Sequence, residues 1–117
     1  MKIKEIFEKV EGDFDGAMSR LMKEERIEKF VKKLPKTEDM ANLRKALEEK
    51  DWETAFRSSH SLKGMALNLG LTKLAEPSCA LCENLRGGTP KEDCAPLMEK
   101  VEEEYKKHMD AISEIDD

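Results

Sequence analysis

The sequence has little of what strand-rich, secreted or membrane-spanning proteins need. Aromatic residues make up only 5% of its 117 residues, with one tryptophan and one tyrosine. No stretch approaches the ~18 consecutive apolar residues that a membrane-spanning helix requires, so no membrane contact is expected. The N-terminus lacks the apolar segment of a secretory signal, and the three cysteines cannot all pair within one chain. These absences predict a cytoplasmic protein, because cysteines stay reduced in that compartment.

An excess of positive charge is also missing. Lysine and arginine number 21 against 26 aspartates and glutamates, which gives a formal net charge of -5. Nucleic-acid-binding proteins need a basic face, so nucleic acid is not an expected partner. Charged residues of both signs are abundant, at 40% of the chain, and Leu, Met, Ala, Glu and Lys recur throughout. This composition is typical of a helical bundle, and the length predicts one domain over residues 1–117, with a monomer as the default.

Apolar residues spaced three and four positions apart predict helices along nearly the whole chain, and prolines and glycines predict where they end. Short helices are expected over residues 2–34, with Asp13 available as an N-cap, and they form an N-terminal extension. Thr37 is predicted to cap the helix that follows this extension.

Two further helices are predicted near the C-terminus. One should cover residues 71–85, and Pro77 should either kink it or delay its start. The other should begin at a capping box over residues 89–92 and continue to Ile112. Pro96 leaves the first turns of that last helix open.

The longest apolar pattern in the middle of the chain predicts a helix over residues 52–69. Asp51 is its expected N-cap, and Gly70 is expected in the left-handed conformation just after its end. Residues three and four apart are neighbours on a helix surface. The face expected in the core therefore holds Ala55, Ser59, Leu62, Ala66 and Leu69. A second face holds Arg57, His60, Lys63, Gly64 and Leu67.

The surroundings of His60 suit a group that accepts and releases phosphate. A phosphoryl group brings about -1.5 to -2 charges near neutral pH. Lys63 lies at i+3 and Arg57 at i−3, so both are placed to offset that charge. Gly64 at i+4 costs a helix about 1 kcal/mol relative to alanine. Its simplest explanation is space, so that the active site of a partner can approach the imidazole.

The chain has no evident phosphate source of its own. It contains no Gly-x-x-x-x-Gly-Lys-Ser/Thr loop, and no cluster of Asp and Asn resembles a magnesium site. The phosphoryl group would therefore come from one partner and leave to another. On this interpretation the chain is a phosphoryl carrier rather than an enzyme, and it needs no cofactor of its own.

The fixed positions around this histidine form a recognisable pattern. His60, Leu62, Lys63, Gly64 and Gly70 match a histidine, any residue, Leu-Lys-Gly, and a second glycine six residues later. The pattern resembles the histidine-containing phosphotransfer (HPt) family of two-component phosphorelays, with a convincing match over about residues 43–85. The resemblance implies an antiparallel up-down four-helix bundle over about residues 37–114, with helices near residues 37–50, 51–69, 71–85 and 90–112.

The same resemblance implies roles and partners. His60 would be the phosphorylated residue, Lys63 would stabilise the phosphohistidine, and Gly64 would leave room for a receiver domain. The implied partners are the aspartate-bearing receiver domains of response regulators and hybrid sensor histidine kinases, with Mg²⁺ expected in the receiver domain. Phe56, Arg57 and Leu67 are the candidates for contact with such a partner.

Other functions stay open at this point. A helical adaptor would bind a receiver or kinase domain without passing phosphate. A metal or redox bundle would use Cys79 and Cys82, which have the Cys-x-x-Cys spacing, although their apolar helical context favours packing in the core. His108 is expected to be structural or solvated.

Overall fold

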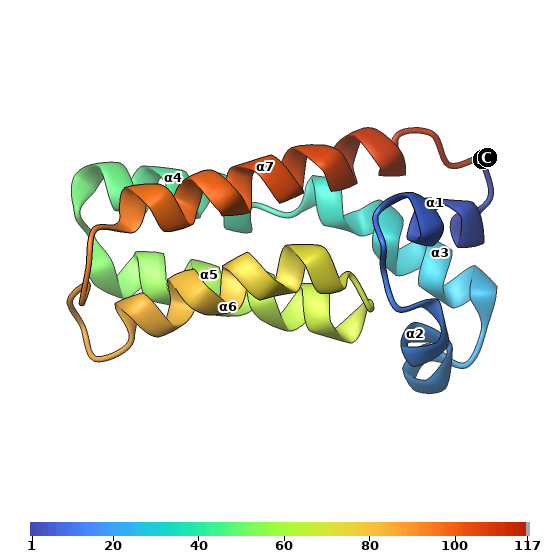
Figure 1. Ribbon diagram of the computed structural model, residues 1–117, viewed down its shortest axis with the longest axis horizontal. Helices are drawn as coiled ribbons and strands as arrows, with labels where there is room; N and C mark the ends of the chain where they lie inside the picture. Colours follow the sequence, from blue (N-terminus) through green and yellow to red (C-terminus); the bar gives the residue numbers. More distant parts are fainter. Residues whose placement is uncertain (117) are drawn as a thin grey trace.

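The computed structural model describes residues 1–116, and this part of the chain is folded into helices without any strand (Figure 1). The prediction of an all-α fold is therefore confirmed. A short 3₁₀ turn, Leu34–Lys36, separates the N-terminal helices from the rest. The α-helices are α1 (Ile3–Lys9), α2 (Phe14–Leu21), α3 (Glu24–Lys33), α4 (Asp39–Glu49), α5 (Trp52–Asn68), α6 (Thr72–Leu85) and α7 (Cys94–Ile112).

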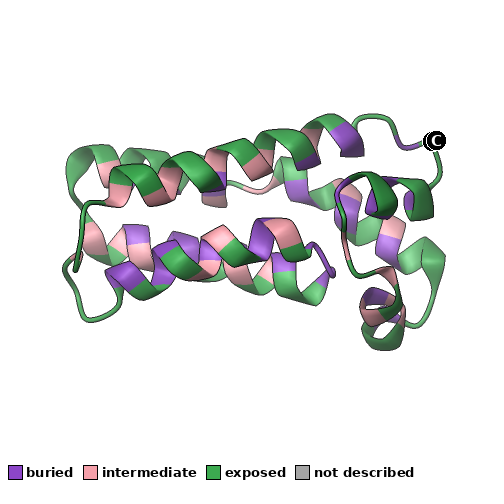
Figure 2. Cartoon of the chain, in the orientation of Figure 1, coloured by how far each residue is buried: buried purple, intermediate pink, exposed green. Residues whose placement is uncertain are grey.

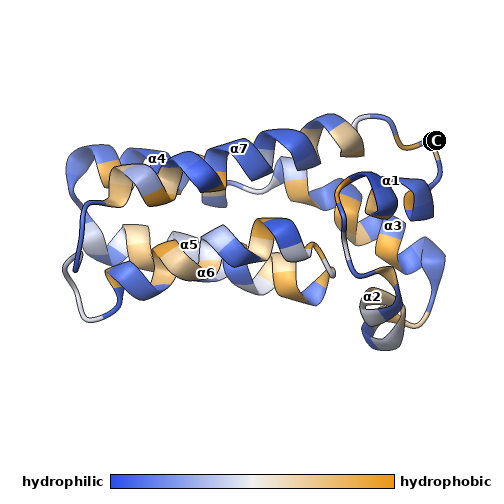
Figure 3. Cartoon of the chain, in the orientation of Figure 1, coloured by the Kyte–Doolittle hydropathy of each residue, from blue (hydrophilic) through white to orange (hydrophobic). Residues whose placement is uncertain are grey.

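Helices α4 to α7 form an antiparallel bundle in which α4 and α7 lie over α5 and α6 (Figure 1). Each contributes a fully buried apolar side chain to the centre: Leu43 and Val101 are 0% exposed, Leu62 is 1% exposed and Leu81 is 0% exposed. Burying a side chain of this size contributes about 1.5–3 kcal/mol. The buried and apolar positions follow the inner faces of the helices, while the outer faces are exposed and hydrophilic (Figures 2 and 3).

The N-terminal extension packs across one end of this bundle. Ile6 and Phe7 of α1 are each 1% exposed, and Ile27 and Val31 of α3 are 0% exposed, so the extension shares the main core. The first residue lies beside the segment that follows α7, where the amino group of Met1 donates to the carbonyl of Glu114 at 2.8 Å. None of the helices among residues 1–116 is long and apolar enough to cross a membrane.

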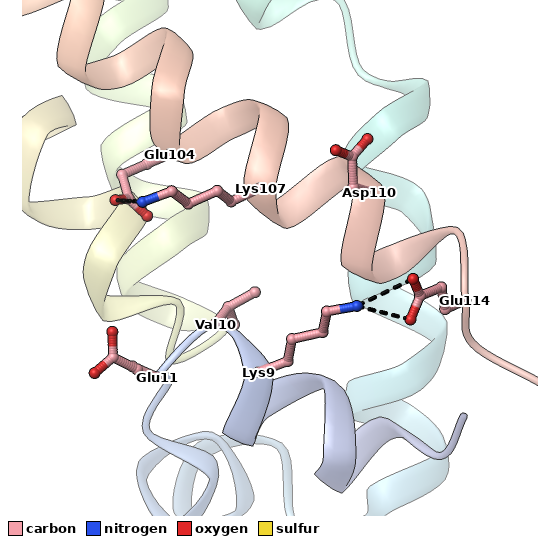
Figure 4. A pocket seen from close by; sticks show the side chains of 7 residues that line it. All are labelled: Lys9, Val10, Glu11, Glu104, Lys107, Asp110 and Glu114. Atoms are coloured by element: carbon pink, nitrogen blue, oxygen red, sulfur yellow. Dashed lines mark hydrogen bonds and ion pairs between the residues drawn. The ribbon is translucent and has the colours of Figure 1, made fainter.

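A charged cleft of about 470 Å³ lies where the end of α1 faces α7 (Figure 4). Lys9 reaches from the α1 side to the carboxylate of Glu114, with the ammonium nitrogen 2.9 Å from Oε2. On the α7 side, Lys107 pairs with Glu104 at 3.3 Å. Of these two ion pairs only Lys9–Glu114 joins the extension to the rest of the chain, and an exposed pair of this kind contributes little stability.

Both ends of α5 are fixed as the sequence predicts. The carboxylate of Asp51 accepts a hydrogen bond from the backbone N–H of Thr54 at 3.2 Å. Hydrogen bonding by the side chain of Thr54, and after it by this N–H, lowers the pKa of Asp51. At the other end Gly70 has φ of +72°. The N–H of Leu71 donates to the carbonyl of Ala66 at 2.8 Å, so α5 ends in a Schellman motif.

The predicted cap at Thr37 is wrong. Helix α4 begins at Asp39 with Glu38 as its N-cap residue, and Glu38 makes no side-chain capping bond. The hydroxyl of Thr37 instead donates back to the carbonyl of Leu34 at 2.9 Å. Thr37 ends the 3₁₀ turn one position before the N-cap of α4, so its hydroxyl lies within that turn and not at the capping position of the helix.

The predicted start of the last helix is also wrong, because residues 89–92 form a connection rather than a first turn. The side-chain oxygen of Asn84 accepts from the N–H groups of Lys91 at 3.1 Å and Glu92 at 2.8 Å. These backbone groups are therefore already bonded to α6. Helix α7 begins at Cys94, and its N-cap is Asp93, which accepts from the N–H of Ala95 at 3.1 Å.

The two helical prolines both lie within helices, and of the two outcomes predicted for Pro77 the structure excludes the delayed start. Helix α6 begins at Thr72 and continues through Pro77, so this proline does not delay the start of the helix. Pro96 is the third residue of α7. Because the first N–H groups of a helix have no partner within it, a proline there removes no intrahelical hydrogen bond.

Candidate functional site

His60 lies in the middle of α5, on its solvent-exposed face. Its neighbours Ser59 and Leu62 are 0% and 1% exposed, since they belong to the face that packs into the bundle. The predicted division of α5 into two faces is confirmed for all five core positions: Ala55, Ser59, Leu62, Ala66 and Leu69 are buried. The helix therefore holds the imidazole of His60 where a second protein can reach it.

The ring of His60 lies next to the ring of Phe56, one turn earlier on α5. Their centroids are 5.9 Å apart and the planes are tilted by 47°. Arg86, at the C-terminal end of α6, also lies near this phenyl ring, with its guanidinium carbon 5.3 Å from the centroid. This is a cation–π distance. Phe56 therefore lies near both His60 of its own helix and Arg86 of α6.

Arg86 also belongs to a small group of charged side chains around Glu83. Arg86 donates to Glu83 on the preceding turn of α6, with Nη2 2.9 Å from Oε1. This hydrogen bond holds the pKa of Glu83 below its usual value, and the charges of Lys63 and Lys91 lower it further. Lys63 is partly buried on α5. The surface beside His60 therefore carries three cationic side chains around the carboxylate of Glu83.

Gly64 stands one turn after His60 in open space. A Cβ built on Gly64 meets no atom within 4 Å, apart from its chain neighbours and the helix's own backbone. Its φ is not positive, unlike that of Gly70. The fold therefore requires glycine at position 70 and not at position 64. Glycine at position 64 destabilises α5 by about 1 kcal/mol relative to alanine, and no contact within the described residues requires it.

Two predicted contact residues are placed on the same exposed face. The guanidinium of Arg57 pairs with Glu53, one turn earlier, at 3.2 Å, and its approach to His60 stays a prediction. Leu67 is 51% exposed, an unusual degree for a leucine on a core helix. It lies two turns after His60, about 10 Å further along the helix axis.

A hydrogen bond between α5 and α4 was not predicted. The hydroxyl of Ser61, the residue after His60, donates to the carboxylate of Asp39 at 2.9 Å. This bond joins the first turn of α4 to the middle of α5. No local pattern could have indicated it, because the two residues are 22 positions apart. By contrast, the Glu83–Arg86 pair has the i, i+3 spacing of neighbours on a helix and could have been found from the sequence.

The other candidate residues are distributed through the bundle. Cys82 is fully buried and Cys79 is partly buried. Residues 1–116 contain no group of three or more His, Cys, Asp and Glu side chains arranged to hold a metal ion. His108 is 0% exposed. Its Nδ1 lies 2.6 Å from the carbonyl of Glu104, and burial lowers its pKa.

Comparison with protein families gives one result that bears on these side chains. The family model described as "Hpt domain" matches residues 27–115, which is more than half of the chain. Comparison with curated proteins gave no match, and comparison with solved structures gave none either. The matched segment covers α4 to α7 and most of α3, and it leaves out α1 and α2.

Proposed function

The chain belongs to the Hpt domain family, and on that premise we propose that it relays a phosphoryl group between the aspartates of receiver domains through a phosphohistidine at His60. Family membership implies phosphotransfer in phosphorelay signalling. The observation that supports the choice of residue is the exposed imidazole of His60, with Lys63 and the open space above Gly64 beside it.

The transfer is a nucleophilic displacement at phosphorus. The lone pair of one imidazole nitrogen attacks the phosphorus of the receiver's aspartyl phosphate, and an N–P bond forms. The P–O bond to the aspartate breaks, and its electron pair leaves with the carboxylate. The same exchange runs in reverse when a second receiver aspartate attacks the phosphohistidine. No oxidant, reductant or water is consumed.

The side chains around His60 have distinct roles in this proposal. The ammonium of Lys63 stabilises the phosphohistidine, and Arg86 adds a second cation from α6. Arg86 is exposed and Lys63 is only partly buried, so solvent screens both charges and each acts over a short range. Gly64 leaves room for the partner's active site. We define the docking surface as Phe56, Arg57, His60, Gly64 and Leu67.

The chain acts as a carrier in this proposal, with catalysis supplied by its partners. The acidic pocket of the receiver domain would hold Mg²⁺, and this cation would offset the negative charge on the transferred group. A hybrid sensor histidine kinase supplies the phosphate and a response regulator takes it. We place the chain in the cytoplasm as a monomer, with its cysteines reduced.

The test is to incubate the chain with a phosphorylated receiver domain and follow the label. Wild type should acquire an acid-labile, base-stable phosphate, and the label should be absent from His60→Gln. Circular dichroism checks that the variant is folded. Label that persists in His60→Gln contradicts the assignment. An adaptor that binds without transfer would instead keep its affinity for the receiver in both proteins and show no label in either.

A further inference from the structure

The N-terminal extension is attached directly to the end of the helix that carries His60. Arg20, near the end of α2, donates from Nε to the carbonyl of Asn68 and from Nη2 to the carbonyl of Leu67, both at 2.9 Å. The N–H of Asp13, just before α2, donates to the carbonyl of Gly70 at 2.7 Å. Three of the four carbonyls of residues 67–70, all except that of Leu69, therefore bond to the extension.

The contact is close enough to depend on glycine. A Cβ on Gly70 would lie 2.4 Å from the carbonyl oxygen of Asp13 and 3.3 Å from the Cβ of Ala17. Gly70 is also in the left-handed conformation, with φ of +72°. This motif glycine therefore has two functions in this chain: it ends α5 and it admits α2.

Arg20 suits the place where it binds. The C-terminal end of a helix carries partial negative charge on its free carbonyls, and a guanidinium both neutralises that charge and donates in a fixed, planar geometry. A small pocket of about 150 Å³ lies between α2 and α5, and Arg20 and Leu67 are among its lining residues. The segment that carries Arg20 lies outside the part of the chain that matches the family model.

We propose that Arg20 is a positioning residue for the docking surface: it holds the last turn of α5 and so fixes where Leu67 meets a receiver domain. This inference rests on the function proposed for His60. Leu67 is 51% exposed, and the main-chain carbonyl of the same residue is one of the two that Arg20 binds. Without Arg20, the last turn of α5 has to be ordered when the receiver docks.

The test separates docking from the chemistry at His60. In the Arg20→Ala variant of the whole chain, the KM for a phosphorylated receiver domain should rise about five- to tenfold. This factor corresponds to the lower part of the free-energy range for ordering one residue's backbone on binding. The kcat should be unchanged, because the imidazole lies two turns away. Labelling of His60 by phosphoramidate, a small donor that needs no docking surface, should also be unchanged. The amide of Leu71 should exchange faster with solvent.

Arg26→Ala is the matched control, since it removes the same charge from an exposed position on α3. It should leave both the KM and the exchange of the Leu71 amide unchanged. An unaltered KM in Arg20→Ala overturns the inference, and so does a fall in phosphoramidate labelling that matches the fall in transfer. Failure of wild type to label at His60 with either donor would instead contradict the proposed function.

Discussion

Replacing Gly64 with alanine should stabilise the protein and impair its transfer reaction at the same time. A Cβ at this position meets nothing within 4 Å apart from its chain neighbours and the helix's own backbone, so it introduces no clash. Alanine in a helix interior is favoured over glycine by about 1 kcal/mol. For a chain of this length, that gain should raise the melting temperature by about 4 °C.

The effect on transfer should have the opposite sign. The added methyl group would stand one turn from His60, in the space through which we propose that a receiver's active site approaches. A displacement of the reacting groups by about 1 Å can cost roughly 10²-fold in rate, so we expect transfer from a phosphorylated receiver to slow by about that factor. Labelling by phosphoramidate should be nearly unaffected, because a small donor can approach the imidazole past the methyl group.

The assay combines thermal unfolding with the rates of labelling by the two donors. Glu103→Ala is a suitable control, since it introduces an alanine on the exposed face of α7, outside the docking surface. It should change neither rate. A Gly64→Ala protein that is more stable and accepts phosphate from the receiver as fast as wild type would refute the steric explanation. A Gly64→Ala protein that is less stable would show that the open space around this residue has been misjudged.

Three further predictions concern other parts of the molecule. Because burial lowers the pKa of His108, the unfolded chain takes up a proton below pH ~6.5 that the folded chain does not. The free energy of unfolding should then fall with decreasing pH by at most about 1.4 kcal/mol per unit, and His108→Leu should flatten this slope in denaturant titrations; an unchanged slope would contradict the assignment. Arg86→Ala should slow labelling of His60 several-fold while the melting temperature stays nearly constant, since its ion pair with Glu83 is exposed. If Arg57→Ala slowed the labelling equally, the location of Arg86 on α6 would have no special importance. Asn84→Ala should cost about 2–3 kcal/mol in chemical denaturation, because the N–H and carbonyl of Glu92 lose this partner and the N–H of Lys91 keeps only its bond to the carbonyl of residue 84. Labelling by phosphoramidate should persist. A loss below about 0.5 kcal/mol, the range of a neutral surface change, would be inconsistent with this role.

The sequence predicts well those features that depend on residues close together in the chain. The inward face of α5, the cap at Asp51 and the left-handed Gly70 all follow from local spacing and local backbone preference, and the structure confirms them. The exposure of His60 follows from the same periodicity. These are the features that place the imidazole in solvent.

The features that the sequence does not predict depend on contacts between distant segments. Asn84 bonds to the backbone of residues 91 and 92 and so removes the capping box that local spacing indicates. Arg20 bonds to carbonyls 47 and 48 residues away. The pattern of each segment by itself contains no signal for such partners, so the boundary of α7 and the attachment of the extension required the three-dimensional structure.

The central claim is that His60 carries phosphate between receiver domains, and phosphorus NMR tests it most directly. Wild-type protein mixed with a phosphorylated receiver should develop a phosphohistidine resonance, which should disappear when a second receiver with Mg²⁺ is added and should never form in His60→Gln. A resonance that appears in His60→Gln, or one that the second receiver fails to discharge, would contradict the account.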